Sequence, residues 1–355
     1  MKLLVMEGDG IGPEIVRATL TVLRRADEKF RLDLSFETAP IGLSALESFG
    51  TTMPQDSLKA AQASKGTILG PISHNIYPPA AEGGLNPSGV LRKSLDLYGN
   101  IRPARTRAAF PPPCKKEFDI VIVRENTEGF YSDRSMHVGP GEIMPTPDLA
   151  LSIRKITREG SLRIVKMAFE QAEARSRKKV TCVHKANVLR ISDGLFLECA
   201  RKVAADHPDI EYEEQLVDSM AALLVRDPGR FDVIVTTNMF GDILSDQASE
   251  LSGSLGLAAS LNVGSKHAVA QAQHGSAPDI AGRDIANPSS LIGSAAMLMA
   301  WLGKIHGDEK WTAAAMAVER ALDHVISSGE VRTPDLGGSH GTQAFALAVA
   351  NRLSA

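Results

Sequence analysis

Short apolar runs alternate along this chain with stretches whose apolar positions repeat at helical spacing. The run LLVM near the N-terminus predicts a buried strand, and residues 13–25 predict a helix with one apolar side. Further strands are predicted over 66–70, 118–126, 179–187, 210–218 and 231–238, and helices over 57–64, 157–176, 219–226, 241–250, 291–302, 312–328 and 341–353. This alternation is typical of an α/β fold with a largely parallel sheet.

The segment MEGDGIGPEI, residues 6–15, joins the first predicted strand to the first predicted helix. A dinucleotide-binding fingerprint requires glycines in the order G-x-G-x-x-G, followed by an acidic residue about 20 positions later. Here Gly8, Gly10 and Gly12 bring the third glycine one residue early, and no acidic residue ends a second strand at that distance. The spacing therefore argues against the pyrophosphate loop of a Rossmann domain.

The length of 355 residues indicates two domains or one large α/β unit. The 39 basic and 42 acidic residues are intermixed, so the net charge of −3 comes without the basic stripe that nucleic-acid binding requires. The stretch 285–303 lacks charges, but Pro288 and its polar residues make it a poor membrane span. We therefore expect neither a nucleic-acid nor a membrane partner.

The cysteines indicate the compartment. Cys114, Cys182 and Cys199 are far apart, odd in number and without a C-x-x-C pair, which argues against disulfides and a cysteine metal site. Met1 leads directly into a strand pattern without the form of a signal peptide. A reducing, cytoplasmic location is expected.

Three carboxylates form the first chemical constellation. Asp242 and Asp246, in NMFGDILSD, are spaced i and i+4 at the predicted start of a helix that follows a strand, and Asp218 ends the predicted strand EQLVD. Ligands of open α/β sheets bind at the carboxyl ends of strands, and hard divalent cations prefer oxygen ligands. Taken alone, the D-x-x-x-D pattern is weak and is more often a solvated helix surface.

A second constellation contains three arginines, a tyrosine and a lysine. Arg92, Arg102 and Arg124 are suited to binding carboxylates, although each alone is more often a surface ion-pair partner. Tyr131 follows a predicted strand, and Lys185 stands near the end of another. A nearby divalent cation and arginines would lower the pKa of a lysine towards neutrality, which suits acid–base catalysis.

These segments together resemble the isocitrate/isopropylmalate dehydrogenase family of metal-dependent β-decarboxylating dehydrogenases. Six motifs occur in the family order: GDGIGPE, LRKSLDLYGNIRP, VRENTEGFY, HKANVLRISDGLF, FDVIVTTNMFGDILSD and HGSAPDIAGRDIANP. The resemblance implies two α/β domains with a clasp arm and not a Rossmann fold. The large discontinuous domain would span 1–98 and 252–355, the small domain 99–251, and the arm about 132–156.

The resemblance also implies chemical roles. Substrate carboxylates would be bound by Arg92, Arg102 and Arg124, and Mg²⁺ or Mn²⁺ by Asp218, Asp242 and Asp246. Lys185 would take the proton of the 2-hydroxyl, and Tyr131 would protonate the enolate left after CO₂ departs. In the family, the residues matching Asp218 and Lys185 come from the neighbouring subunit. An obligate homodimer is therefore expected, and a tetramer remains open.

The resemblance places the cofactor on the loop HGSAPDIAG. Asp279 stands where NAD-dependent members carry an aspartate, which accepts from both ribose hydroxyls and repels a 2′-phosphate. NADP-dependent members carry a lysine–tyrosine pair there instead. We therefore expect NAD. The implied cofactor residues are Ile11, His274, Gly275, Ser276, Ala277, Asp279 and Asn287.

In the family, the residues just before the position of Arg92 determine the substrate. This chain departs from each family pattern there. Isocitrate enzymes have S-x-N-x-x-x-R, and this chain has Asn86 and Ser88 in swapped order. Isopropylmalate enzymes have E-x-x-L-L-x-x-R, but Leu85, Ser88 and Gly89 occupy the positions of the glutamate and the leucine pair. A polar, roomy pocket favours a polar or acidic substituent on the malate, so an isocitrate-like di- or tricarboxylate is expected.

Two further departures keep other substrates open. The tract 70–92 is several residues longer than usual, and Gln271 replaces a glutamate on the cofactor side. The alternatives are 3-isopropylmalate, homoisocitrate, tartrate and D-malate dehydrogenases. A non-catalytic regulatory subunit of an isocitrate dehydrogenase is an alternative of another class, although all the implied catalytic and metal residues are present.

Overall fold

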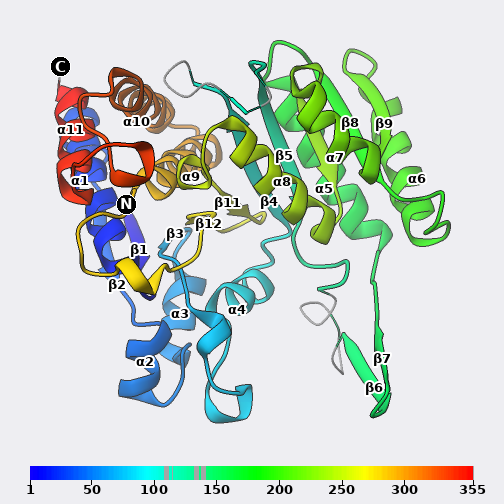
Figure 1. Cartoon of the computed structure of the whole chain (residues 1–355), viewed down its shortest axis with the longest axis horizontal. Coiled ribbons are helices and arrows are strands. Elements are labelled where there is room, and N and C mark those ends of the chain that lie inside the picture. Colours follow the sequence, from blue (N-terminus) through cyan, green and yellow to red (C-terminus); the bar gives the residue numbers. More distant parts are fainter. Residues whose placement is uncertain (108–111, 114, 132–135, 137–140, 355) are drawn as a thin grey trace. The chain divides into compact units, whose positions relative to one another are not determined.

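The computed structural model describes residues 1–107, 112–113, 115–131, 136 and 141–354 (Figure 1). The chain divides into two compact units. The first unit contains Met1–Leu95, Arg107–Ala109 and Ser254–Ala355, and the second contains Asp96–Thr106 and Phe110–Gly253. No helix within the described part of the chain is both long enough and apolar enough to span a membrane.

The sheet strands of the first unit lie in the order β2 (Ser35–Thr38), β1 (Lys2–Met6), β3 (Gly66–Leu69), β12 (Ala268–Gln271) and β11 (Leu261–Val263). β2, β1, β3 and β12 pair in parallel, whereas β11 and β12 are antiparallel. All four residues of β3 are buried, as are the last four of β1. Continuous apolar runs of this kind are typical of parallel strands covered on both faces.

The longer helices of the first unit pack on one another. α1 (Gly12–Phe30) packs against α9 (Ser289–His306), α10 (Glu309–Ser328) and α11 (Thr342–Ser354). α9 also packs against β12 and β3 and is buried over most of its length, in agreement with the lack of charged residues before Lys304 in its last turn. Three short helices complete this unit: α2 (Gly42–Phe49), α3 (Gln55–Ala63) and α4 (Pro87–Ser94).

The sheet strands of the second unit lie in the order β4 (Gly99–Arg105), β5 (Asp119–Glu125), β10 (Val233–Thr236), β8 (Lys179–His184) and β9 (Glu211–Leu216). β4 and β5 are antiparallel, and the other pairs are parallel. The helices of this unit are α5 (Arg158–Glu173), α6 (Ser192–Ala205), α7 (Val217–Arg226) and α8 (Asn238–Ser252). α8 packs against β4, β5 and β10, and a cluster including Ile122, Phe231 and Leu244 fills the space between these elements.

A two-stranded hairpin, β6 (Glu142–Thr146) and β7 (Leu149–Ser152), extends from the rest of the second unit (Figure 1). Every residue of both strands is exposed, including Ile143, Met144, Leu149 and Leu151. The predicted arm, 132–156, contains this hairpin, but its residues 132–135 and 137–140 lie outside the described residues. Cys114 also lies outside them.

Two boundary predictions were wrong in ways that matter for the site. β9 ends at Leu216, so Asp218 lies in the first turn of α7 and does not end a strand. An acidic side chain is favourable there because the first turn of a helix exposes backbone N–H groups. α8 begins at Asn238, three residues before its predicted start, so Asp242 and Asp246 lie beyond its first turn.

The loop after β1 passes very close to the loop that contains Ser276. The Ile11 N–H donates to the Ser276 carbonyl oxygen at 2.9 Å. Gly10 has φ of +57°, and a Cβ at this position would lie 2.0 Å from the Ser276 oxygen. Glycine is therefore required here both by the backbone conformation and by the close approach.

We predict that Gly10→Ala destabilises the protein by clearly more than the about 1–2 kcal/mol of left-handed strain alone, because its methyl group has no space. The matched control is Gly50→Ala, since Gly50 has φ of +70° but no neighbouring atom within 4 Å of a Cβ. Urea unfolding midpoints measure both variants. Equal losses of stability would contradict the role given to the close approach.

Candidate active site

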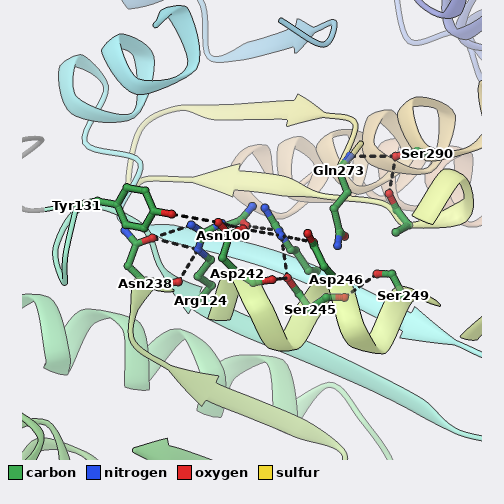
Figure 2. A network of polar contacts seen from close by, with 12 residues as sticks. Asn100, Arg124, Tyr131, Asn238, Asp242, Ser245, Asp246, Ser249, Gln273 and Ser290 are labelled. Atoms are coloured by element: carbon green, nitrogen blue, oxygen red, sulfur yellow. Dashed lines mark hydrogen bonds and ion pairs between the residues drawn. The ribbon is translucent and has the colours of Figure 1, made fainter. Parts of the chain in front are cut away.

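A buried arginine and the helix after β10 form the centre of a polar cluster in the second unit (Figure 2). Arg124, near the end of β5, is 1% exposed and forms an ion pair from Nη1 to Asp242 Oδ1 at 2.5 Å. Its Nη2 donates to Asn238 Oδ1 at 2.7 Å, and its Nε donates to the Asn238 carbonyl oxygen at 2.9 Å. Gly241 lets α8 lie directly on Arg124, because a Cβ there would come within 2.5 Å of the arginine Cγ.

A second arginine brings the two α8 carboxylates together. Arg102 of β4 is 7% exposed, and its Nη1 lies 3.1 Å from Asp242 Oδ1 and 3.2 Å from Asp246 Oδ1. The same nitrogen donates to Ser245 Oγ at 2.7 Å, while Nε donates to Asn100 Oδ1 at 2.6 Å. Both carboxylates therefore converge on one guanidinium nitrogen, and neighbouring polar groups hold that guanidinium in a fixed orientation.

Tyr131 joins this cluster from the segment after β5. Its hydroxyl donates to Asp242 Oδ2 at 3.4 Å, and its ring centroid lies 5.8 Å from Arg124 Cζ (Figure 2). The structure thus brings together five predicted site residues from four segments of the second unit: Arg102, Arg124, Tyr131, Asp242 and Asp246. This arrangement offers cationic groups, carboxylate oxygens and a phenol within one cluster.

Lys185 belongs to a separate group at the end of β8. Its Nζ forms an ion pair with Asp218 Oδ1 at 2.5 Å, and its main-chain N–H donates to Asp193 Oδ2 at 2.6 Å. The Lys185 ammonium lowers the pKa of the Asp218 carboxyl through this hydrogen bond and its charge. Sequence reasoning missed Asp193, although it lies within the quoted motif HKANVLRISDGLF.

The carboxylates fit a divalent cation only in part within one chain. Among the described residues, no three His, Cys, Asp or Glu side chains lie close enough together to hold a metal. Asp218 pairs with Lys185, whereas Asp242 and Asp246 converge on Arg102. The two α8 carboxylates nevertheless supply the hard oxygen donors that Mg²⁺ and Mn²⁺ prefer.

A buried aspartate that sequence reasoning also missed organises the loops of the first unit. Asp9 Oδ1 accepts from the Leu43 N–H at 2.7 Å, and Oδ2 accepts from the Ser73 N–H at 2.9 Å and from the Tyr77 hydroxyl. Ser73 Oγ in turn lies 2.7 Å from Ser276 Oγ. Burial and the Asp9 carboxylate raise the pKa of Tyr77. The long tract 70–92 is thereby tied to the loop predicted to hold the cofactor.

The predicted cofactor residues lie in the first unit. Ile11 and Ser276 are buried and hydrogen-bonded through their backbones, whereas Gly275 and Asp279 are exposed. Ala277 has φ of 36° and precedes the 3₁₀ turn Pro278–Ile280, which presents Asp279. These contacts define the shape of the loop, and the carboxylate of Asp279 faces solvent.

Two further predicted cofactor residues, His274 and Asn287, are affected by burial or by hydrogen bonds within the protein. Burial lowers the pKa of His274. Asn287 is 7% exposed; its Nδ2 donates to Asp335 Oδ2 at 2.9 Å, and its Oδ1 accepts from the Ser289 N–H at 3.0 Å. The side chain of Asn287 is therefore held in one orientation by the turn at Asp335.

The predicted substrate residues of the first unit lie on α4. Asn86 caps this helix, with its Oδ1 accepting from the Gly89 N–H at 3.0 Å. Ser88 is buried and donates from Oγ to Gln271 Oε1 at 3.0 Å, while Arg92 lies in the last turn. The local sequence explains the helix, because Asn at the N-cap followed by proline is a favoured start.

Known proteins that resemble the chain over its full length carry names from one enzyme family. The profile of the isocitrate/isopropylmalate dehydrogenase family matches residues 2–349. A 3-isopropylmalate dehydrogenase of Methanothermobacter thermautotrophicus is 41% identical over 99% of this chain and 98% of its own. An isocitrate/homoisocitrate dehydrogenase of Thermus thermophilus is 42% identical over 99% of this chain and 98% of its own.

A solved structure agrees with these relatives. The crystal structure of isocitrate dehydrogenase from Methylococcus capsulatus superimposes with a TM-score of 0.87 at 39% identity, over 100% of this chain and 99% of that one. The expected α/β fold of this family is thus confirmed. Members of the family act on dicarboxylates and typically use NAD(P) and a divalent metal. The chain belongs to the isocitrate/isopropylmalate dehydrogenase family and is a β-decarboxylating dehydrogenase.

Proposed function

We propose that this dehydrogenase uses NAD and Mg²⁺ or Mn²⁺ to convert an isocitrate-like 3-substituted malate into a 2-keto acid and CO₂. The observation that carries the proposal is the meeting of two buried arginines with Asp242 and Tyr131. Buried guanidinium groups that are already oriented favour bidentate binding of carboxylates. The same cluster provides oxygen ligands for a cation and a phenol that can deliver a proton.

In the proposed mechanism, Arg102 and Arg124 orient the substrate through its carboxylates. Asn100 and Asn238 hold these guanidinium groups, so little reorganisation is needed on binding. Asp242 and Asp246 would hold the metal together with Asp218 of a second subunit. When bound, NAD would supply the hydride acceptor for C2, and the metal would supply positive charge beside the 2-oxygen.

Two residues of the chain move protons in this scheme. Lys185 takes the proton of the 2-hydroxyl, and Tyr131 gives a proton to C3 once the β-carboxylate has left as CO₂. Tyr131 lies next to Asp242, whereas Lys185 lies beside Asp218. Because no three acidic side chains among the described residues converge within one chain, we infer a shared site in a homodimer. The exposed apolar residues of the β6–β7 hairpin support such an interface.

The family resemblance assigns the position of Gln271 to the cofactor side, but because Gln271 also bonds Ser88, we propose that these two residues together select the substrate. Gln271 Oε1 accepts from Ser88 Oγ at 3.0 Å and from Asn262 Nδ2 at 3.4 Å, so this neutral amide is anchored beside α4. A glutamate at the same position would add a negative charge next to Ser88 and repel an acidic substituent. The neutral glutamine thus favours a substrate that carries a further carboxylate.

A substrate panel tests the proposed function directly. We expect the highest kcat/KM with isocitrate when malate, tartrate, homoisocitrate and 3-isopropylmalate are compared in the presence of NAD and Mn²⁺. Gln271→Glu is expected to lower kcat/KM for isocitrate roughly tenfold, equivalent to about 1.4 kcal/mol, and to affect 3-isopropylmalate much less. Gln55→Glu, at an exposed position of the same unit, is the control for added charge. A clear preference for 3-isopropylmalate would contradict the proposed substrate class.

The metal assignment has its own test. We expect Mn²⁺ to raise the melting temperature of EDTA-treated protein, because a ligand at 100 times its Kd stabilises by about 2.7 kcal/mol. Asp246→Asn should reduce this shift. We choose Asp246 because its side chain is 54% exposed, whereas loss of Asp242 would remove the charge partner of buried Arg124. Asp227→Asn, which alters a surface carboxylate paired with Lys116, should leave the shift unchanged.

The proposed NAD preference depends on Asp279. We expect kcat/KM to be higher with NAD than with NADP, and Asp279→Asn to raise KM for NAD roughly 10- to 100-fold, since hydrogen bonds to a charged group contribute about 1.5–3 kcal/mol. Asp56→Asn changes an exposed carboxylate on α3 and serves as the control. A wild-type preference for NADP would show that the role of Asp279 is wrong.

A further inference from the structure

A buried ion pair lies behind Lys185 in the second unit. Arg154 Nη1 is 2.6 Å from Asp193 Oδ1, and the side chains of Arg154 and Asp193 are 8% and 0% exposed. Arg154 follows the β6–β7 hairpin, and Asp193 lies in the first turn of α6. Two residues far apart in the sequence are therefore held together away from water.

Asp193 fixes the backbone at Lys185. Its second oxygen, Oδ2, accepts from the Lys185 N–H at 2.6 Å. The turn between them is closed by the Leu189 N–H donating to the Lys185 carbonyl at 2.8 Å and by the Asp193 N–H donating to the Leu189 carbonyl at 3.0 Å. A short bond to a charged acceptor and a closed turn together restrict the direction in which the Lys185 side chain leaves the sheet.

Arg154 extends this contact to the segment that precedes α8. Its Nη1 donates to Ser192 Oγ at 2.8 Å, and its Nη2 donates to Thr237 Oγ1 at 3.1 Å. Its Cζ also lies 5.9 Å from the ring centroid of Phe130 and 5.6 Å from that of Phe240. The Arg154 guanidinium thus contacts Phe130, which precedes Tyr131, the start of α6 at Ser192 and Asp193, and Thr237, the N-cap residue of α8.

We propose that Arg154 and Asp193 are positioning residues for Lys185 and that their ion pair fixes where the lysine amine is delivered for catalysis. The proposal rests on the proposed role of Lys185 as the base. A proton acceptor displaced by about 1 Å can lose on the order of 100-fold in rate, so the position of the Lys185 backbone matters for turnover. Asp193 itself is fully buried and acts through the Lys185 main chain.

A second buried aspartate in the same unit, Asp232, provides a comparison, although its partner Arg175 is 22% exposed and Arg177 also pairs with it. Arg175 Nε lies 2.5 Å from Asp232 Oδ1, and the Asp232 side chain is 1% exposed. Asp232 Oδ2 accepts from the Lys179 N–H at 3.4 Å. Asp232 thus binds an arginine and a main-chain N–H, as Asp193 does. It lies at the amino ends of β8 and β10, whereas Lys185 follows the carboxyl end of β8. A purely structural role for Asp193 predicts that its neutralisation, like that of Asp232, lowers stability without a specific loss of kcat.

The test compares Asp193→Asn, Arg154→Lys and Asp232→Asn in the intact enzyme, at a temperature where circular dichroism shows each to be folded. We expect both Asp193→Asn and Arg154→Lys to lower kcat roughly 10- to 100-fold while KM for NAD stays within about twofold. The solvent deuterium isotope effect on kcat should increase, because proton transfer to a displaced amine becomes slower. Asp232→Asn should lower the melting temperature but keep kcat and the isotope effect of the wild type.

Two results would overturn the proposal. One is a folded Asp193→Asn variant with wild-type kcat and isotope effect. The other is an equal loss of kcat in Asp232→Asn, which would assign both pairs to general stability. Lys185→Ala separates the proposal from the proposed function: if that variant turns over normally, the assignment of Lys185 as the base fails, and the role of the ion pair fails with it.

Discussion

The burial of the Arg124 guanidinium is the constraint on which the cluster of the second unit depends. An arginine that is 1% exposed requires an anionic partner and acceptors for its remaining N–H groups. Asp242 supplies the charge, and Asn238 accepts on the other side. Both belong to the first five residues of α8, so this helix must begin close to the end of β10 and lie directly on β5. Gly241 provides the space for that approach.

The same constraint explains which parts of the site can be read from the sequence. Arg124 and Asp242 follow long apolar runs, and such runs identify buried strands whose carboxyl ends carry ligand-binding groups. The strands β5, β8 and β10 and the helix α5 were accordingly predicted near their observed bounds. Asp218 was misplaced because the apolar residues Leu216 and Val217 run across the boundary between β9 and α7, and no glycine or proline marks the change.

Contacts between residues distant in the sequence could not be predicted in this way. Asp9 accepts from Ser73 and Tyr77, and Arg154 pairs with Asp193, across separations that no periodicity encodes. In the sequence, Asp193 cannot be distinguished from an ordinary acidic residue in the first turn of a helix. Its importance emerges only when burial is known, because burial makes a partner obligatory. The helix α4 was also missed, although Asn86 and the following proline are a recognisable helix start.

Family membership alone does not identify the substrate of this chain. A relative named for 3-isopropylmalate and one named for isocitrate and homoisocitrate are 41% and 42% identical to it, so overall identity does not distinguish these substrates. The residues that are proposed to bind the metal and to move protons lie in the second unit, where ion pairs or hydrogen bonds to charged groups hold them. In the first unit, the contact between Ser88 of α4 and Gln271 of β12 joins two neutral side chains, although α4 also carries Arg92 in its last turn. Because a neutral contact can be exchanged without leaving a buried charge unpaired, substrate preference is free to change while the decarboxylating chemistry is retained.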